Sequence, residues 1–254
     1  MIQMIMAYSN GYMGGYGKGY GGYGYGMYFD PTYILIIIGV VISLIASARV
    51  RSTFARYRND RARCGMTGAE VAERLMRVNG IYDVNIVHVS GNLTDHYNPS
   101  NKTLALSDSV YNSTSIAAIS VAAHEVGHCI QHDKGYTPLK IRTTLVPAAN
   151  FGSTASWLFI LAGLFFGSFY WLVDVGIILF SLAVLFQIVT LPVEFNASSR
   201  ALAALRSNGI LYDDELGKGK KVLGAAALTY VAAAAAAILQ LLRLILLFGN
   251  RRRD

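Results

Sequence analysis

Two histidines four residues apart enclose a glutamate in the segment His124-Glu125-Val126-Gly127-His128. On a helix, residues four apart lie on one face, so both imidazoles can bind one metal ion. Glu125 directly follows the first histidine, a position from which its carboxylate can accept a proton from a water molecule at the metal. Small residues precede the motif, and Gly127 allows another backbone to approach closely. We interpret the segment as a zinc-binding helix with Glu125 as the base. The alternative is two histidines that merely share a helix turn.

A catalytic zinc ion needs a third protein ligand and an open position. His132 shares a helix face with His124 and His128, but the helix rise separates His124 from His132 by about 12 Å, too far for one ion. His132 is therefore expected at the polar surface or the substrate rim. Glu194 is the better ligand, because it begins the helical segment 194–205 after an apolar hairpin. The alternative for Glu194 is an interfacial carboxylate favoured by the helix dipole.

A water molecule activated in this way can attack a peptide carbonyl that the metal polarises. This reaction also needs a hydrogen-bond donor for the oxyanion that forms. His96 and Tyr97, in an expected loop, are candidates, and the alternative is a turn capped by Asp95. Arg200 could serve the same role or bind a substrate carboxylate, although contact with lipid phosphate is the simpler interpretation. A strand around 104–106 could pair with an extended substrate by strand addition.

The composition indicates a membrane protein. Apolar residues make up 54% of the 254 residues and charged residues 15%, against about 25% charge in soluble domains. The net charge of +7 comes from basic residues beside apolar spans, which favours anionic lipid headgroups over nucleic acid. Cys64 and Cys129 are interpreted as reduced thiols. The sequons at Asn92, Asn101 and Asn112 leave a glycosylated lumenal domain as an alternative.

The order of segments predicts an α-helical membrane protein with about four transmembrane helices and a small α+β zincin-like unit. Arginines after the first apolar span place the next segment in the cytoplasm by the positive-inside rule, whereas the basic C-terminus conflicts with that rule. Asp174 is expected at the outer tip of the hairpin and a loop at 212–221. The predicted segments are a flexible Gly/Tyr-rich tail (1–30), a first span (31–48), the cytoplasmic zincin-like unit (49–142), a transmembrane hairpin (143–193), a cytoplasmic segment with the third zinc ligand (194–221), a fourth span (222–248) and a basic C-terminus (249–254).

Within the α+β unit, local signals predict two helices and two strands. Thr67 and Glu70 have the spacing of a capping box at the start of an amphipathic helix that Gly80 ends. Residues 83–89 and 102–107 resemble two paired strands. Ser113 or Ser115 then begins the helix that carries the histidines.

The chain resembles two related families of membrane peptidases. His-Glu-x-x-His, a hairpin and a later Glu-containing helix are similar to the HtpX-type membrane gluzincins. The segments LTDHYNP (93–99), VAAHEVGHCIQH (121–132) and LPVEFNASSRAL (191–202) resemble the YugP-type neutral zinc metallopeptidases of bacterial membranes, over about residues 30–250. The resemblance implies Zn²⁺ at His124, His128 and Glu194, with Glu125 as base.

One position departs from the HtpX-type pattern. That pattern has an aspartate four residues after the ligand glutamate, where it can orient a zinc histidine, and this chain has Ser198. A hydroxyl accepts a hydrogen bond more weakly than a carboxylate, so the partners of the ligands must be arranged differently. Asn196 is a second candidate for this role.

Together these patterns indicate an integral membrane zinc endopeptidase that acts on unfolded or membrane-associated polypeptides at the cytoplasmic face. Its expected partners are a polypeptide substrate and the lipid bilayer. The sequence neither predicts nor excludes a homo-oligomer. A membrane scaffold with a non-catalytic zinc site is the main alternative. A channel or transporter is disfavoured, because no charged residue lies centrally in a span.

Overall fold

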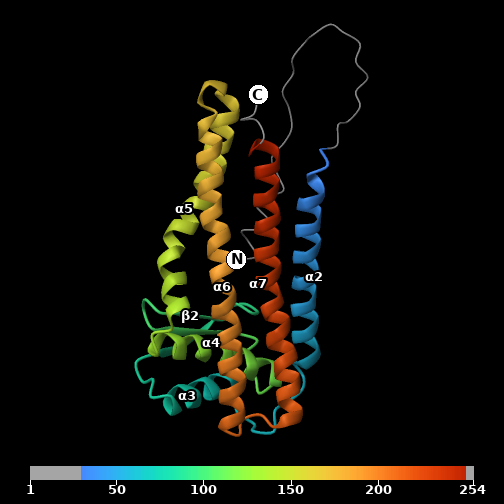
Figure 1. Ribbon diagram of the computed structural model, residues 1–254. Coiled ribbons are helices and arrows are strands. Elements are labelled where there is room, and N and C mark those ends of the chain that lie inside the picture. Colours follow the sequence, from blue (N-terminus) through green and yellow to red (C-terminus); the bar gives the residue numbers. More distant parts are fainter. Residues whose placement is uncertain (1–29, 250–254) are drawn as a thin grey trace. The chain divides into compact units, whose positions relative to one another are not determined.

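The computed structural model describes residues 30–249, and the predictions made for residues 1–29 and 250–254 lie outside this range. Helices dominate, with one small sheet (Figure 1). The elements are α2 (Tyr33–Tyr57), α3 (Gly68–Val78), β1 (Asn85–Val89), β2 (His96–Asn98), β3 (Thr103–Ser107), α4 (Ile116–Asp133), α5 (Thr137–Phe165), the 3₁₀ turn η1 (Gly167–Phe169), α6 (Trp171–Ser207) and α7 (Asp213–Phe248).

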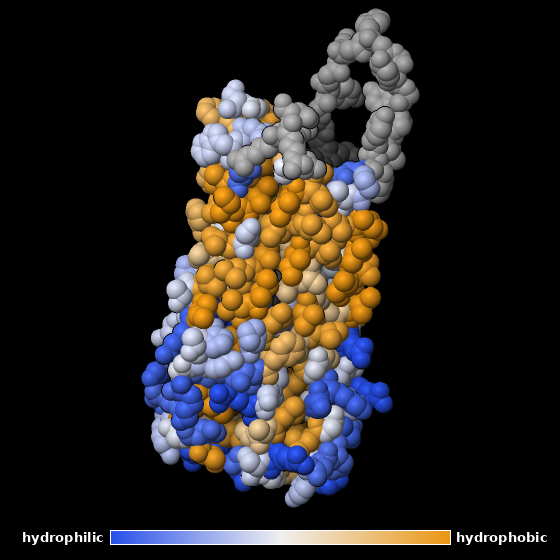
Figure 2. Space-filling view, in the orientation of Figure 1, coloured by the Kyte–Doolittle hydropathy of each residue, from blue (hydrophilic) through white to orange (hydrophobic). Residues whose placement is uncertain are grey.

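Four of the described helices, α2, α5, α6 and α7, are long and apolar enough to cross a membrane, judged by length and composition. They pack side by side in the order α5–α6–α7–α2 (Figure 1). Figure 2 shows apolar side chains covering the middle of these helices on one face, with hydrophilic side chains gathered around the α+β unit. Many leucine, isoleucine and valine side chains on these helices are exposed. Such a surface suits contact with lipid. The protein is thus an α-helical membrane protein with a small α+β unit, as the sequence predicts.

The helices begin and end at other residues than hydropathy predicts. α2 continues past residue 48 to Tyr57, so several of the arginines after the apolar run lie on the same helix. The turn of the hairpin lies between Phe165 and Trp171, and the prediction that Asp174 forms the tip is wrong. Asp174 lies in the first turn of α6, where the helix dipole favours a carboxylate.

Residues 194–221 do not form a separate segment. They comprise the end of α6, a short connection and the first turns of α7. The predicted loop at 212–221 is helical from Asp213 onward. The reason is capping: the Glu215 carboxylate accepts hydrogen bonds from the backbone N–H groups of Tyr212 and Arg63, at 3.1 and 2.9 Å. Hydropathy misses such polar helix ends because it scores only the apolar part.

The α+β unit begins with α3, whose capping is as predicted. The Thr67 side chain accepts from the backbone N–H of Glu70, and the Glu70 side chain accepts from the backbone N–H of Thr67. The helix ends before Gly80, which has a φ of 76°, a left-handed conformation that favours glycine.

The sheet has the order β1-β3-β2. β1 and β3 are the two predicted strands, and they pair in parallel. β2 lies in the stretch predicted as a loop and pairs antiparallel with β3. With three residues it is too short to show a periodic pattern. Because both edges of β3 are occupied, the predicted pairing of a substrate at 104–106 is wrong.

Helix α4 lies in the middle of the α+β unit and is buried along almost its whole length. Ser115 is its N-cap and accepts from the backbone N–H of Ala118 at 3.1 Å, which decides between Ser113 and Ser115. The helix packs against α3, α6 and α7. Its buried side chains include several alanines, which let these neighbours come close: Ala117, Ala118, Ala122 and Ala123.

Gly127 lies at a close backbone contact between α4 and α6. A Cβ atom added at Gly127 would lie 2.6 Å from the carbonyl oxygen of Ala197. The prediction that Gly127 admits another backbone is confirmed. The contact sets the separation of the two helices that carry the predicted metal ligands.

We expect Gly127→Ala to push α4 and α6 apart. The overpacking should cost about 1–3 kcal/mol of folding free energy and reduce the zinc bound per chain. The matched control is Gly224→Ala on α7, where an added Cβ meets nothing within 4 Å. Thermal unfolding and metal analysis of the purified proteins measure both effects. Equal stability and equal zinc content in the two variants would contradict this account of the contact.

Candidate metal centre

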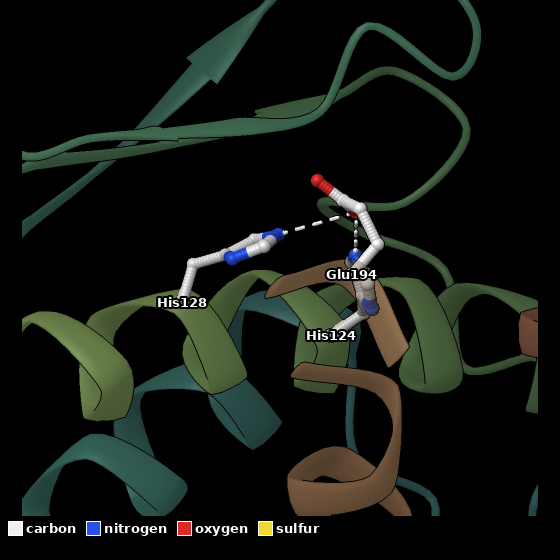
Figure 3. A group of neighbouring side chains, drawn as sticks. All are labelled: His124, His128 and Glu194. Carbon is white, nitrogen blue, oxygen red and sulfur yellow. Dashed lines mark ion pairs between the residues drawn. The ribbon is translucent and has the colours of Figure 1, made fainter. Parts of the chain in front are cut away.

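Three side chains from two helices converge on one point. His124 and His128 extend from α4, and Glu194 extends from α6 toward both of them (Figure 3). Oε2 of Glu194 lies 3.3 Å from Nε2 of His124 and 3.6 Å from Nε2 of His128. All three residues are buried, Glu194 to 2% exposure. The structure thus brings together the three residues predicted as metal ligands.

Hydrogen bonds fix the protonation of His128. Nε2 of Gln131 donates to the backbone carbonyl of Val193 at 2.8 Å, so the amide oxygen of Gln131 faces Nδ1 of His128, at 3.0 Å. An amide oxygen only accepts, so Nδ1 of His128 carries a proton. In the neutral imidazole, Nε2 then has a free lone pair directed at Glu194.

His124 also has a polar partner at Nδ1, but a hydroxyl can donate or accept, so this partner orients the ring without fixing its proton. Its Nδ1 lies 3.1 Å from the hydroxyl oxygen of Ser198, the residue that stands where the HtpX-type pattern has aspartate. Asn196 does not contact a zinc histidine directly. Its side-chain oxygen accepts from Nε2 of Gln131 at 3.0 Å and from Nε of Arg200 at 2.7 Å. Asn196 and Arg200 therefore hold Gln131, which in turn orients His128.

The donor set fits a zinc ion. Oε2 of Glu194 is buried and has no hydrogen-bond donor, although it faces two imidazole nitrogens. A carboxylate oxygen against imidazole lone pairs is repulsive unless a cation lies between them. Ligand atoms on a tetrahedral zinc ion with bonds of about 2.0–2.1 Å are roughly 3.3 Å apart, close to the two observed separations. Among the described residues, these three form the one group of His, Cys, Asp or Glu side chains with metal-ligand spacing.

Glu125 lies beside these ligands and faces a cavity of about 430 Å³. Burial raises the pKa of Glu125 to about 7, and a zinc ion at the neighbouring ligands would lower that pKa by favouring the carboxylate. A carboxyl group in this range can take up and release a proton near neutral pH. The cavity is lined by Asp95, His96, Tyr97, Pro99, Ser100, Glu125, His128, Leu139, Arg142, Thr143, Val146, Pro147, Glu194 and Tyr230.

The residues predicted around the ligands have different positions. His96 and Tyr97 belong to β2 and line the cavity. His132 lies apart from the three ligands, and its Nδ1 is 2.8 Å from the Tyr97 hydroxyl. Asp95 accepts from the backbone N–H and the hydroxyl of Ser107, at 2.7 and 2.9 Å. Asp95 thus fixes β2 against the end of β3, and its burial raises the pKa of the carboxyl group.

Three residues at the site were not predicted. Gln131 follows His128 by three positions, a helical spacing that could have indicated it. Arg142 on α5 lies with Nη1 3.4 Å from Oε1 of Glu194. Tyr230 on α7 lines the cavity and interacts with the same carboxyl group. No spacing in the sequence relates Arg142 or Tyr230 to the motif, because each comes from a different long helix.

Comparison with known proteins identifies the family of the chain. Residues 32–249 match the family described as "Putative neutral zinc metallopeptidase". The chain belongs to this family. The protein described as "Putative membrane protease YugP" from Bacillus subtilis (strain 168) is 48% identical over 220 residues, which cover 87% of this chain and 97% of that protein. No solved structure matches the chain.

Membership confirms the resemblance drawn from the three sequence segments. The metal of this zinc peptidase family is also the metal that two imidazoles and one carboxylate suit. The match spans the described helices and the α+β unit together. Zinc is therefore the cofactor of this protein.

Replacement of Glu194 and of His132 tests which of the two residues is the third zinc ligand. We expect Glu194→Ala to lower zinc affinity by more than the roughly 10–100-fold that loss of a ligand's hydrogen-bond partner costs. His132→Ala, which removes a partner of Tyr97, should leave zinc affinity unchanged. Titration of the purified apoproteins with zinc against a competing chelator measures both. A larger loss in His132→Ala than in Glu194→Ala would overturn the ligand assignment.

Proposed function

We propose that the protein is an integral membrane zinc-dependent endopeptidase that hydrolyses peptide bonds of unfolded or membrane-associated proteins at the cytoplasmic face. The observation that carries this proposal is the position of Glu125, buried beside the His-His-Glu group at the wall of a cavity. A structural zinc site has no need of a free carboxyl group or an open cavity next to the ligands.

The roles of the protein's own residues follow from their positions. A bound zinc ion supplies Lewis acidity toward the substrate carbonyl and acidifies a water molecule. Glu125 accepts the proton that the attacking water loses, and it then delivers that proton to the nitrogen of the departing amine. Gln131 and Ser198 orient His128 and His124 through their Nδ1 atoms.

Strand β2 offers a way to hold an extended polypeptide. It is an edge strand of the sheet, and His96 and Tyr97 on it line the cavity. A substrate segment paired with the free edge of β2 would bind mainly through its backbone, which tolerates many side chains. Such pairing requires an extended segment, so it favours unfolded regions over folded domains.

The cavity joins the α+β unit to the membrane helices. One wall comes from β2 and α4, and the other comes from α5 and α7 through Arg142, Thr143, Val146, Pro147 and Tyr230. This position supports substrates that lie at a membrane surface. The arginines that follow the apolar part of α2 support a cytoplasmic location for the α+β unit, because cytoplasmic flanks of spans are rich in Arg and Lys.

The decisive experiment compares the wild-type protein with Glu125→Gln in membrane vesicles of known orientation. The substrate is an unfolded soluble polypeptide such as casein, added outside the vesicles. The wild-type protein should cleave it in inverted vesicles, which expose the cytoplasmic face, and should not cleave it in right-side-out vesicles. Glu125→Gln should retain its zinc and lose roughly 10²–10⁴-fold in rate. Mass spectrometry of the products and metal analysis give both readouts. Normal cleavage by Glu125→Gln would refute the mechanism, and cleavage only by right-side-out vesicles would refute the orientation.

A further inference from the structure

Hydrolysis of a peptide bond places negative charge on the carbonyl oxygen, and the cavity must hold a hydrogen-bond donor for that charge. The donors that line it are His96, Tyr97, Ser100, Arg142, Thr143 and Tyr230. Most of them already have other partners, and these partners decide which donor is available.

The two donors on β2 are engaged elsewhere. Nδ1 of His96 lies 3.0 Å from the backbone carbonyl of Thr94, so Nδ1 carries the proton, and Nε2 of the neutral ring can only accept. The Tyr97 hydroxyl is paired with Nδ1 of His132 at 2.8 Å. Both residues fit a role in binding the substrate backbone better than the role of oxyanion donor.

Two further hydroxyl groups are excluded by their positions. The Thr143 hydroxyl donates to the carbonyl of Leu139 within its own helix at 2.9 Å. Ser100 is exposed in the turn between β2 and β3, away from the buried ligands. Arg142 and Tyr230 remain, and both lie at Glu194.

Arg142 and Tyr230 have different relations to Glu194. The guanidinium of Arg142 lies at Oε1 of Glu194, 3.4 Å away, and balances the charge of that carboxylate, which leaves Oε2 for the cation. Arg142 is therefore a positioning residue for the third ligand. The Tyr230 side chain comes from α7, lines the same cavity as Glu194 and Glu125, and interacts with both carboxyl groups. Its hydroxyl can turn to a substrate without leaving Glu194 unpaired, because Arg142 stays.

We propose that Tyr230 is a catalytic residue whose hydroxyl donates a hydrogen bond to the oxygen of the scissile carbonyl as that oxygen becomes anionic. The water oxygen bonds to the carbonyl carbon, the electron pair of the C=O double bond moves to the carbonyl oxygen, and the water proton goes to Glu125. Tyr230 keeps its own proton throughout. This inference rests on the proposed peptidase function and assigns its oxyanion donor to a membrane helix.

The test is Tyr230→Phe, which removes only the hydroxyl. Zinc content and thermal stability should equal those of the wild type, KM should change by less than about 3-fold, and kcat should fall by roughly 10²–10³-fold. A second readout does not depend on turnover. The Kd of a phosphinic peptide, whose tetrahedral anionic group resembles the transition state, should rise by about the same factor. Binding of an uncleaved peptide should be equal in Glu125→Gln and in Glu125→Gln combined with Tyr230→Phe.

The control is Tyr82→Phe, at a residue that is 80% exposed outside the cavity and should show no change in any readout. Unchanged kcat and unchanged phosphinic peptide affinity in Tyr230→Phe would overturn the assignment. Loss of zinc in Tyr230→Phe would also overturn it, since the hydroxyl would then act by holding Glu194. A wild-type protein that cleaves no polypeptide would refute the proposed function instead, which keeps the two failures distinct.

Discussion

A buried carboxylate oxygen facing the Nε2 atoms of two imidazoles is the interaction on which the rest of the structure depends. Removing the charge of Glu194 from water costs several kcal/mol unless it is paired and hydrogen-bonded. Arg142 pairs with one oxygen of that carboxylate, and the other oxygen has no donor. A zinc ion at the second oxygen compensates the remaining charge and relieves the repulsion from His124 and His128. A zinc ion bound here would therefore stabilise the fold.

This constraint links the α+β unit to the membrane helices. Glu194 lies on α6, one of the apolar helices, and the histidines lie on α4. The close contact at Gly127 sets the distance between the two helices, and Gln131 bridges them through Val193 and Asn196. Arg142 and Tyr230 add α5 and α7 to the same site. Any change in the packing of these helices therefore changes the geometry of the candidate metal site.

The sequence predicts the parts of the site that depend on local spacing. His124, Glu125 and His128 follow from one helix turn, and the close approach at Gly127 follows from the missing side chain. Ser198 was singled out by the resemblance to the HtpX-type pattern, which has aspartate at that position. The capping box of Thr67 and Glu70 is equally local and equally correct. Each of these signals needs only a few neighbouring residues.

Features that depend on tertiary packing were beyond the sequence. The third strand, β2, exists because β3 pairs with it, and its three residues carry no pattern of their own. Arg142 lies in a short polar segment before the predicted hairpin, and Tyr230 lies in an alanine-rich apolar stretch, so neither position carries a signal that relates it to the histidines. The polar start of α7 was assigned to a loop because its stabilising partner, Arg63, is distant in sequence. In each case, the missing information was which segments lie side by side.

The central claim is that one zinc ion is bound by His124, His128 and Glu194. X-ray absorption spectroscopy at the zinc edge tests it directly on the wild-type protein and on Glu194→His. The wild type should show only nitrogen and oxygen ligands at about 2.0–2.2 Å, two of them imidazoles, whereas position 194 should supply a third imidazole in a Glu194→His variant, whose side chain has the same reach. A sulfur ligand in the wild type, or the same number of imidazoles in both proteins, would contradict the claim.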